Sequence, residues 1–62
     1  MIGFKTERSE YYIDNMNKLV SGGIFGKTWH SFMQLQAIVG CNAIIVLSSG
    51  KVIRTGVVKC YL

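Results

Sequence analysis

Acidic residues are scarce in this chain, and their positions exclude most hydrolytic chemistry. Glu7, Glu10 and Asp14 are the only acids, so the sequence holds none after Asp14. A hydrolytic triad needs a histidine base that a nearby acid orients. Nothing in the spacing brings one of these acids close to His30, the only histidine. We therefore predict that the protein is not an enzyme.

Cysteine is also rare, and the two that occur do not form a metal-binding pair. Cys41 and Cys60 lie far apart in the sequence, and His30 is the only other soft ligand. Zinc sites usually contain closely spaced ligand pairs, so we expect no metal and no cofactor. Two cysteines in a chain without a signal peptide are typical of reduced, buried thiols in a cytosolic protein. A disulfide between them stays open as an alternative.

Proline, internal repeats, linkers and long apolar runs are all missing. Without a long apolar run, we expect no membrane span. Residues 1–4 are apolar but run straight into Lys5, Glu7 and Arg8, which is not the pattern of a signal peptide. We therefore expect one small domain over residues 1–62. Its expected location is the cytoplasm, or the host cytoplasm if the chain is viral.

The apolar residues concentrate in residues 43–62, which read as a long β-hairpin. β-Branched residues lie on both sides of Ser49–Gly50, a pair typical of a two-residue turn. With this turn, Leu47 faces Val52 across the hairpin. Both faces of the hairpin are largely apolar, which indicates that both are covered in the folded protein.

The rest of the chain offers too little material to cover both faces of this hairpin. A chain of 62 residues buries only about 60% of its unfolded surface. One helix can cover one face, and a second copy of the chain is the simplest cover for the other. We therefore predict a homo-oligomer, with a monomer that carries an apolar patch as the alternative. The predicted interface consists of Ile44, Val46, Ile53 and Val57.

Residues 6–20 read as a helix. Thr6 or Ser9 can cap its start, and two glutamates follow in the first turn, where the helix dipole favours them. The spacing of four apolar residues then produces one stripe along the predicted helix. These residues are Tyr12, Met16, Leu19 and Val20.

The loop over residues 21–28, with the sequence SGGIFGKT, resembles a Walker A loop, whose pattern is G-x-x-x-x-G-K-[ST]. Ser21 replaces the first glycine, and a predicted helix precedes the loop where a strand belongs. We therefore do not expect nucleotide hydrolysis. A glycine-rich backbone with Lys27 and Thr28 can still form a nest that binds a phosphate. The alternative is a flexible turn.

Residues 29–39 fit either a strand or a helix. In a strand, Trp29, Met33 and Leu35 share one face, and Phe32 lies on the other with the polar residues. Helix propensity favours the alternative. We choose the strand, so the predicted fold is α+β. It consists of an N-terminal helix followed by a three-stranded antiparallel meander, completed by oligomerisation. Two helices plus a β-hairpin are the alternative.

Residues 44–58 are similar to the first strands of Sm-like and SH3-like small barrels. Those barrels use an apolar strand, a glycine turn and a basic second strand, and the same order occurs here. The pattern is shared by β-hairpins in general, and the remaining barrel strands do not follow Leu62. The similarity therefore indicates a type of hairpin and not membership of a family.

The distribution of charge suggests an anionic partner. All residues after Asn15 that carry a charge are cations, and aromatic residues are interleaved with them. We therefore predict a binding module for a nucleotide or nucleic acid. Predicted phosphate contacts are Arg54, Lys51, Lys27, Lys59 and Thr28, of which Arg54 is the strongest candidate. Predicted stacking residues are Trp29, Phe25 and Tyr61.

An inhibitor or adaptor that binds a host protein is the alternative function. Phages and mobile elements make small proteins of this kind, which lack catalytic residues. Such a protein would dock on its partner through an exposed hairpin edge or an apolar surface. The positions of the cations separate the two hypotheses. Cations gathered in one groove favour the phosphate ligand, and cations scattered around an apolar patch favour the protein partner.

Overall fold

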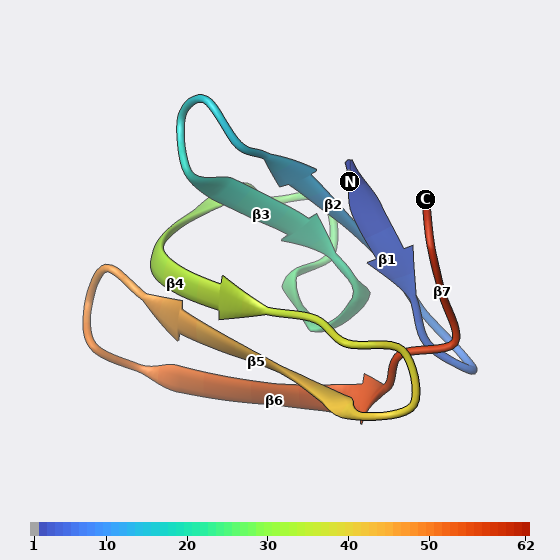
Figure 1. Cartoon of the computed structure of the whole chain (residues 1–62). Coiled ribbons are helices and arrows are strands. Elements are labelled where there is room, and N and C mark those ends of the chain that lie inside the picture. Colours follow the sequence, from blue (N-terminus) through green and yellow to red (C-terminus); the bar gives the residue numbers. More distant parts are fainter. Residues whose placement is uncertain (1) are drawn as a thin grey trace.

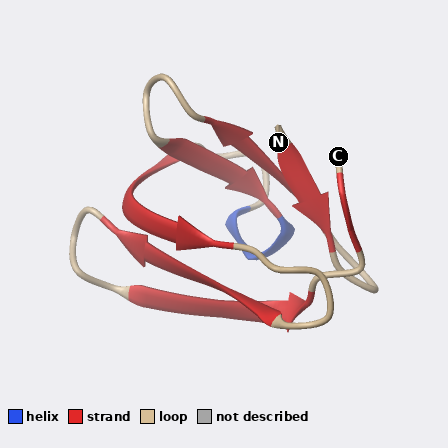
Figure 2. Ribbon diagram, in the orientation of Figure 1, coloured by secondary structure: helices blue, strands red, loops and turns tan. Residues whose placement is uncertain are grey.

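The computed structural model describes residues 2–62, and Met1 lies outside the described residues. The regular secondary structure of the described chain is nearly all β-strand, with one short 3₁₀ turn and no α-helix among residues 2–62 (Figure 2). In chain order the elements are β1 (Gly3–Lys5), β2 (Glu10–Asp14), β3 (Leu19–Gly22), η1 (Gly23–Phe25), β4 (His30–Gln36), β5 (Asn42–Leu47), β6 (Val52–Val57) and β7 (Cys60–Tyr61).

The strands form one antiparallel sheet in the order β6-β5-β4-β3-β2-β1-β7. From β1 to β6, each strand pairs with the next one in the sequence, and β7 returns to pair with β1. The sheet curls, so that β1–β3 and β4–β6 enclose a common interior (Figure 1). Ile2 N donates to Leu62 O at 3.4 Å, so the two ends of the described chain lie side by side (Figure 1).

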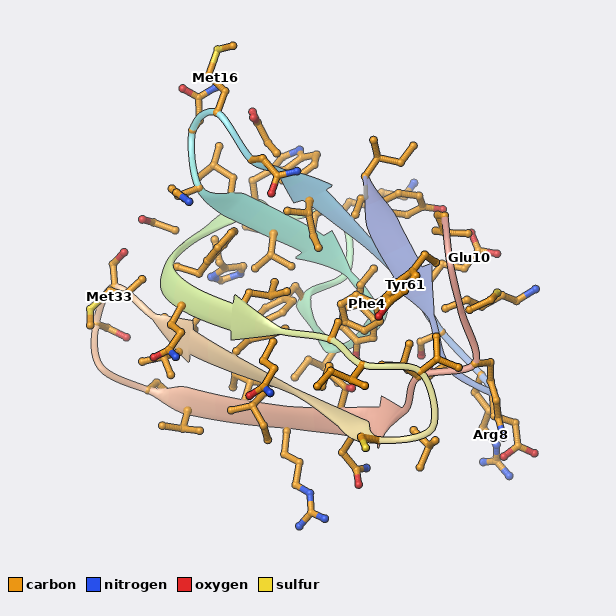
Figure 3. All side chains as sticks on the ribbon, viewed as in Figure 1. Phe4, Arg8, Glu10, Met16, Met33 and Tyr61 are labelled. Carbon is orange, nitrogen blue, oxygen red and sulfur yellow. The ribbon has the colours of Figure 1, made fainter. Side chains whose placement is uncertain are left out.

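The core draws on both halves of the curled sheet. Phe4, Tyr11 and Val20 come from the first half, Ile45 comes from the second, and Val58 follows β6. Phe4 points into the interior (Figure 3) and stacks on Tyr11 with ring centroids 4.9 Å apart. The first half of the chain therefore covers the inner face of the hairpin, and the outer face, with Val52 61% exposed, stays uncovered within one chain. The homo-oligomer stays a prediction, which a solution mass well above 6.9 kDa would support.

The predicted helix over residues 6–20 is wrong, and with it the α+β fold class and its two-helix alternative. Burial alternates along β2, where Tyr11 and Ile13 are buried and Tyr12 is exposed, as expected of a strand. Met16, which the helical stripe placed in the core, is 91% exposed at the tip of the β2–β3 hairpin (Figure 3). Aromatic and β-branched residues favour strands, and here they override a spacing that also fits a helix.

Turn chemistry between β2 and β3 explains why the helix does not form. Asp14 Oδ1 accepts hydrogen bonds from the backbone N–H groups of Met16 and Asn17, both at 3.1 Å, and Oδ2 accepts one from Asn17 Nδ2 at 2.9 Å. Lys18 then adopts a positive φ of 56°. Side-chain bonds of this kind stabilise turns at the expense of helix. The predicted caps, Thr6 and Ser9, close the β1–β2 turn instead.

The strand predicted over residues 29–39 is confirmed as β4, but its predicted faces are partly wrong. The register between β4 and β5 shifts between Phe32 and Gln34, which marks a β-bulge. The extra residue lets both Phe32 and Leu35 pack toward the core. Met33, which strict alternation placed beside Leu35, is 65% exposed.

The predicted β-hairpin is present as β5 and β6, with a loop one residue longer than expected. Leu47 N donates to Lys51 O and Gly50 N donates to Leu47 O, both at 2.8 Å. Gly50 has a φ of 93°, as the last position of a three-residue hairpin loop requires. Val52 therefore faces Val46 and not Leu47. Because side chains alternate, this shift moves residues 52–55 of β6 to the opposite face.

A second irregularity in this hairpin makes Thr55 a structural residue. The register of β5 and β6 shifts around Ala43, whose backbone N–H donates to Thr55 Oγ1 at 3.2 Å. Both residues are buried. We expect Thr55→Val to leave this N–H group without a partner, which costs about 1–3 kcal/mol. The melting temperature should fall by at least about 5 °C, as measured by circular dichroism.

Thr55→Ser is the matched control, because it keeps the hydroxyl and removes only a methyl group. It should melt closer to the wild type than Thr55→Val does. A valine variant as stable as the wild type would show that the hydroxyl has no structural role.

The chain passes from β6 to β7 through Val58 and Lys59, and this segment joins the two ends of the sheet. Val58 N donates to Cys41 O at 2.8 Å, and Lys59 N donates to Lys5 O at 2.7 Å. β7 then pairs with β1. β6 has a partner on one side only, so its other edge stays free next to the β1–β2 turn.

Candidate functional site

A groove of about 370 Å³ lies along the free edge of β6. Residues 54–57 and Lys59 form one wall, and residues 6–9 of the β1–β2 turn form the other. Tyr11 and Ile24 complete the lining. Arg8 marks the position of the turn in Figure 3, at the end of the molecule where β6 runs into β7. The groove therefore lies at the junction between the two ends of the sheet.

The groove is positively charged. Of the seven lysines and arginines in the chain, Arg8, Arg54 and Lys59 line it. Glu7 is the one acid among the lining residues. All four side chains are exposed, and Arg54 also bonds to Asn42 on β5. Cations on both walls of one concave surface attract anions more strongly than the same charges scattered over the protein.

The polar groups of the groove differ in the hydrogen bonds that they can still donate. Arg54 Nη2 donates to Asn42 Oδ1 at 3.2 Å, which leaves the other guanidinium N–H groups for a ligand. The hydroxyls of Thr6 and Thr55 both donate to backbone carbonyls, at 3.4 Å and 2.8 Å. A hydroxyl has a single proton, so neither threonine is a free donor. The cations, together with the outward N–H groups of the β6 edge, are the main donors to an anion.

The structure brings together two of the five side chains that the sequence suggested as phosphate contacts. Arg54 and Lys59 both line the groove, whereas Lys51, Lys27 and Thr28 do not. Lys51 follows the β5–β6 loop, and the other two lie between η1 and β4. The predicted set is therefore split between different parts of the surface.

Arg8, which lies opposite β6 on the second wall, was not among the predicted contacts. It was left out because the predicted contacts came only from the acid-free part of the chain after Asn15, and residues 6–20 were read as one continuous helix. A signal was present. Residues 6–9 are polar and separate two segments rich in aromatic and β-branched residues, which is typical of a hairpin turn.

The glycine-rich loop after β3 has few backbone N–H groups left for a phosphate. Four of them already donate hydrogen bonds within the protein, at distances of 2.8–3.4 Å; they belong to Gly22, Ile24, Gly26 and Thr28. A nest binds an anion through successive unoccupied N–H groups. Most of these N–H groups therefore hold the loop and η1 against the curled sheet and are not available to an anion.

The three aromatic residues predicted to stack on bases lie away from the groove. Trp29 is 49% exposed and precedes β4. Phe25 packs against Tyr11 and His30, with ring centroids 6.3 Å and 4.9 Å away. Tyr61 lies on β7, and its hydroxyl donates to a backbone carbonyl at 2.7 Å. The ring contacts of Phe25 also make the single histidine part of the packing around the core.

The four residues of the predicted oligomer interface do not share one surface. Ile44 and Val46 are half-buried on the outer face of β5. The changed register turns Ile53 inward, where it packs against the core. Val57 is exposed and lines the groove. An interface between copies would therefore need a different set, with Val52 beside Val46.

The cysteines and the remaining ionisable groups add no second site. Cys41 and Cys60 are free and exposed, so the prediction that they are buried is wrong. Within residues 2–62, no cluster of three metal-ligating side chains occurs. The hydrogen bond from Tyr12 to Glu10 raises the pKa of the tyrosine, and the Asn17 side chain is the main cause that lowers the pKa of Asp14. Both shifts lie outside the groove.

The part of the chain that the structure describes contains no helix of the length and apolarity that crossing a membrane requires. What it contains is an all-β scaffold with one basic groove, made from a hairpin turn and a free strand edge. Comparison of this chain with protein-family models, with curated proteins and with solved structures finds no match.

Proposed function

We propose that this protein is a non-enzymatic binding module that holds a phosphate-bearing ligand in the basic groove. The observation that carries the proposal is the gathering of Arg8, Arg54 and Lys59 around one concave surface with a single acid. Cations gathered in one groove were the feature expected of a ligand site. The other four cations lie outside this groove.

The side chains of the groove suit a phosphate in different ways. Arg8 and Arg54 present planar forks that can hold two phosphate oxygens each, and Lys59 adds a compact charge. Because the residues that carry them line opposite walls, a phosphate in the groove would have cations available on two sides. The groove is open, so water weakens each contact. An exposed charge pair contributes only about 0.2–1 kcal/mol.

The test compares two triple variants that remove the same charge. The first replaces Arg8, Arg54 and Lys59 with alanine, and the matched control replaces three cations outside the groove: Lys18, Lys27 and Lys51. Binding of a fluorescent oligothymidylate of about twelve nucleotides is measured at about 50 mM salt, where phosphate contacts are strong. We expect the groove variant to bind at least about tenfold more weakly, equivalent to about 1.4 kcal/mol, and the control to change by less than about threefold.

Equal losses in both triple variants would mean that net charge alone attracts the oligonucleotide, and no binding by the wild type would end the proposal. Circular dichroism melts of all three proteins establish that each variant is folded. The control is informative because Lys27 and Lys51 were themselves sequence-based candidates.

The free edge of β6 favours a second function, that of an inhibitor or adaptor that binds a host protein. An unpaired strand can accept a strand from a partner, and Val52 and Val57 on β6 are both exposed. In that case the groove and the free edge would bind the partner protein and not an oligonucleotide.

We further propose a cytoplasmic location, that of the host cell if the chain is viral. Two free, exposed thiols are consistent with a reducing compartment.

A further inference from the structure

The lining of the groove lacks the side chains that usually read a nucleobase. Bases are recognised by stacking on exposed aromatic rings and by hydrogen bonds to their edges. Tyr11 is the one aromatic residue in the lining. It is only 2% exposed, because its ring stacks on Phe4. Its hydroxyl accepts a hydrogen bond from Ile24 N at 3.4 Å. No ring face is therefore available to a base inside the groove.

The remaining uncharged residues of the groove offer contact without discrimination. Ile24 and Val57 are exposed and apolar, so they can touch any base but form no hydrogen bond with it. The protons of the Thr6 and Thr55 hydroxyls are already donated to the backbone. Glu7, which could accept from a base amino group, would also repel the phosphates. Besides the Ser9 hydroxyl and the outward N–H groups of the β6 edge, the groups that can select a ligand are thus the three cations.

We propose that the groove recognises the charge of a chain of phosphates and does not read the base. This inference rests on the proposed function and narrows its ligand class. The ligand is a linear polyanion, either an oligophosphate or the sugar–phosphate backbone of a single strand. Two observations support the inference. Cations lie on both walls of the groove, in the β1–β2 turn and in the segment from β6 to β7, and the one aromatic ring in the lining is buried.

A competition experiment tests this ligand class. Fluorescent oligothymidylate bound to the wild-type protein is displaced with tripolyphosphate, ATP or adenosine at about 50 mM salt. We expect tripolyphosphate and ATP to compete within about threefold of each other, and adenosine not to compete at millimolar concentration. A preference for ATP over tripolyphosphate of more than about tenfold, a difference that one good base contact would produce, would overturn the inference.

Homopolymers separate the two sources of phosphate. Oligothymidylate, oligoadenylate and oligocytidylate of equal length should bind within about threefold of one another. Affinity that rises with length up to a limit would indicate a nucleic-acid backbone, and affinity as high for tripolyphosphate as for the longest strand would indicate a free oligophosphate. A preference of more than about tenfold for one homopolymer would overturn the inference while leaving the proposed function in place.

Trp29→Ala supplies an independent variant. Trp29 was predicted to stack on a base and is exposed, but it does not line the groove. We expect this variant to bind oligothymidylate within about twofold of the wild type. Stacking on Trp29 would instead cost about 1–3 kcal/mol when removed, a loss of at least about fivefold, and would overturn the inference. If no phosphate ligand binds the wild type at all, the proposed function itself fails.

Discussion

Phe4→Ala is expected to abolish cooperative folding at room temperature. Phe4 is fully buried and stacks on Tyr11, in contact with the rest of the core. Removing a buried phenyl ring costs about 3–5 kcal/mol, because the surrounding side chains fill the cavity only partly. A chain of 62 residues has a total stability of about 3–9 kcal/mol. The loss is therefore comparable to the whole free energy of unfolding.

Two measurements decide the outcome for Phe4. Amide chemical-shift dispersion in a two-dimensional NMR spectrum should collapse for Phe4→Ala, and its thermal melt should lose its cooperative transition. Phe4→Leu keeps most of the volume and should retain a cooperative melt at a lower temperature. Met16→Ala, at a side chain that is 91% exposed, should behave like the wild type. A cooperative Phe4→Ala variant that melts near the wild type would mean that the core does not depend on this stack.

Gly22→Ala is expected to produce the second large loss of stability. Gly22 has φ 87° and ψ −176°, a conformation that is almost restricted to glycine. A Cβ atom at this position would also collide with the backbone carbonyl oxygen of Glu10, on the neighbouring strand β2. The conformational strain alone costs about 1–3 kcal/mol. The collision adds to it, because β2 and β3 would have to separate.

Gly50→Ala is the matched control for Gly22→Ala. Gly50 has nearly the same φ, 93°, but a Cβ atom there would meet nothing within 4 Å. Replacing it should cost only the strain of a left-handed backbone, about 1–2 kcal/mol. Urea denaturation of both variants should show a larger loss for Gly22→Ala by at least about 1 kcal/mol. Equal losses would show that the close approach of β2 and β3 is not a constraint.

The C-terminal half of the molecule could be predicted from the sequence because its signals are local. The β-branched runs on both sides of Ser49–Gly50 predicted the β5–β6 hairpin, and residues 29–39 predicted β4. The register was wrong by one residue, because the loop closes between Leu47 and Lys51 and not around two central residues. A single extra loop residue is invisible in the hydrophobic pattern, yet it reverses the faces of β6.

The N-terminal half was mispredicted because two periodicities compete there. Tyr12, Met16, Leu19 and Val20 fit a helical stripe, whereas Tyr11 and Ile13 fit the inner face of a strand. The difference is made by Asp14, whose side chain accepts backbone hydrogen bonds and closes a turn in the middle of the segment. Packing against the second half of the sheet is what stabilises the strands of this segment, since a hairpin alone is only marginally stable in water.

The candidate site, too, could be predicted only in part, because residue type is visible in the sequence and spatial position is not. Arg54 and Lys59 were identified from charge and residue type, but Arg8 was not, and the stacking residues were placed in a site that they do not line. Charge is a property of composition, so it can be read without a structure. The position of one charge relative to another depends on which strands pair, and the β1–β2 turn lies opposite β6 only when the sheet has curled.

The sequence by itself determined the basic character of this protein, the scarcity of groups for catalysis, and the β-hairpin of residues 43–62. Each of these follows from residue type or from alternation over a few positions. Tertiary structure alone decided that residues 3–22 form three strands joined by turns, that the curled sheet covers the hairpin's inner face, and that cations from distant segments share one groove. These features depend on pairing between residues far apart in the chain, where long-range contacts outweigh local propensity.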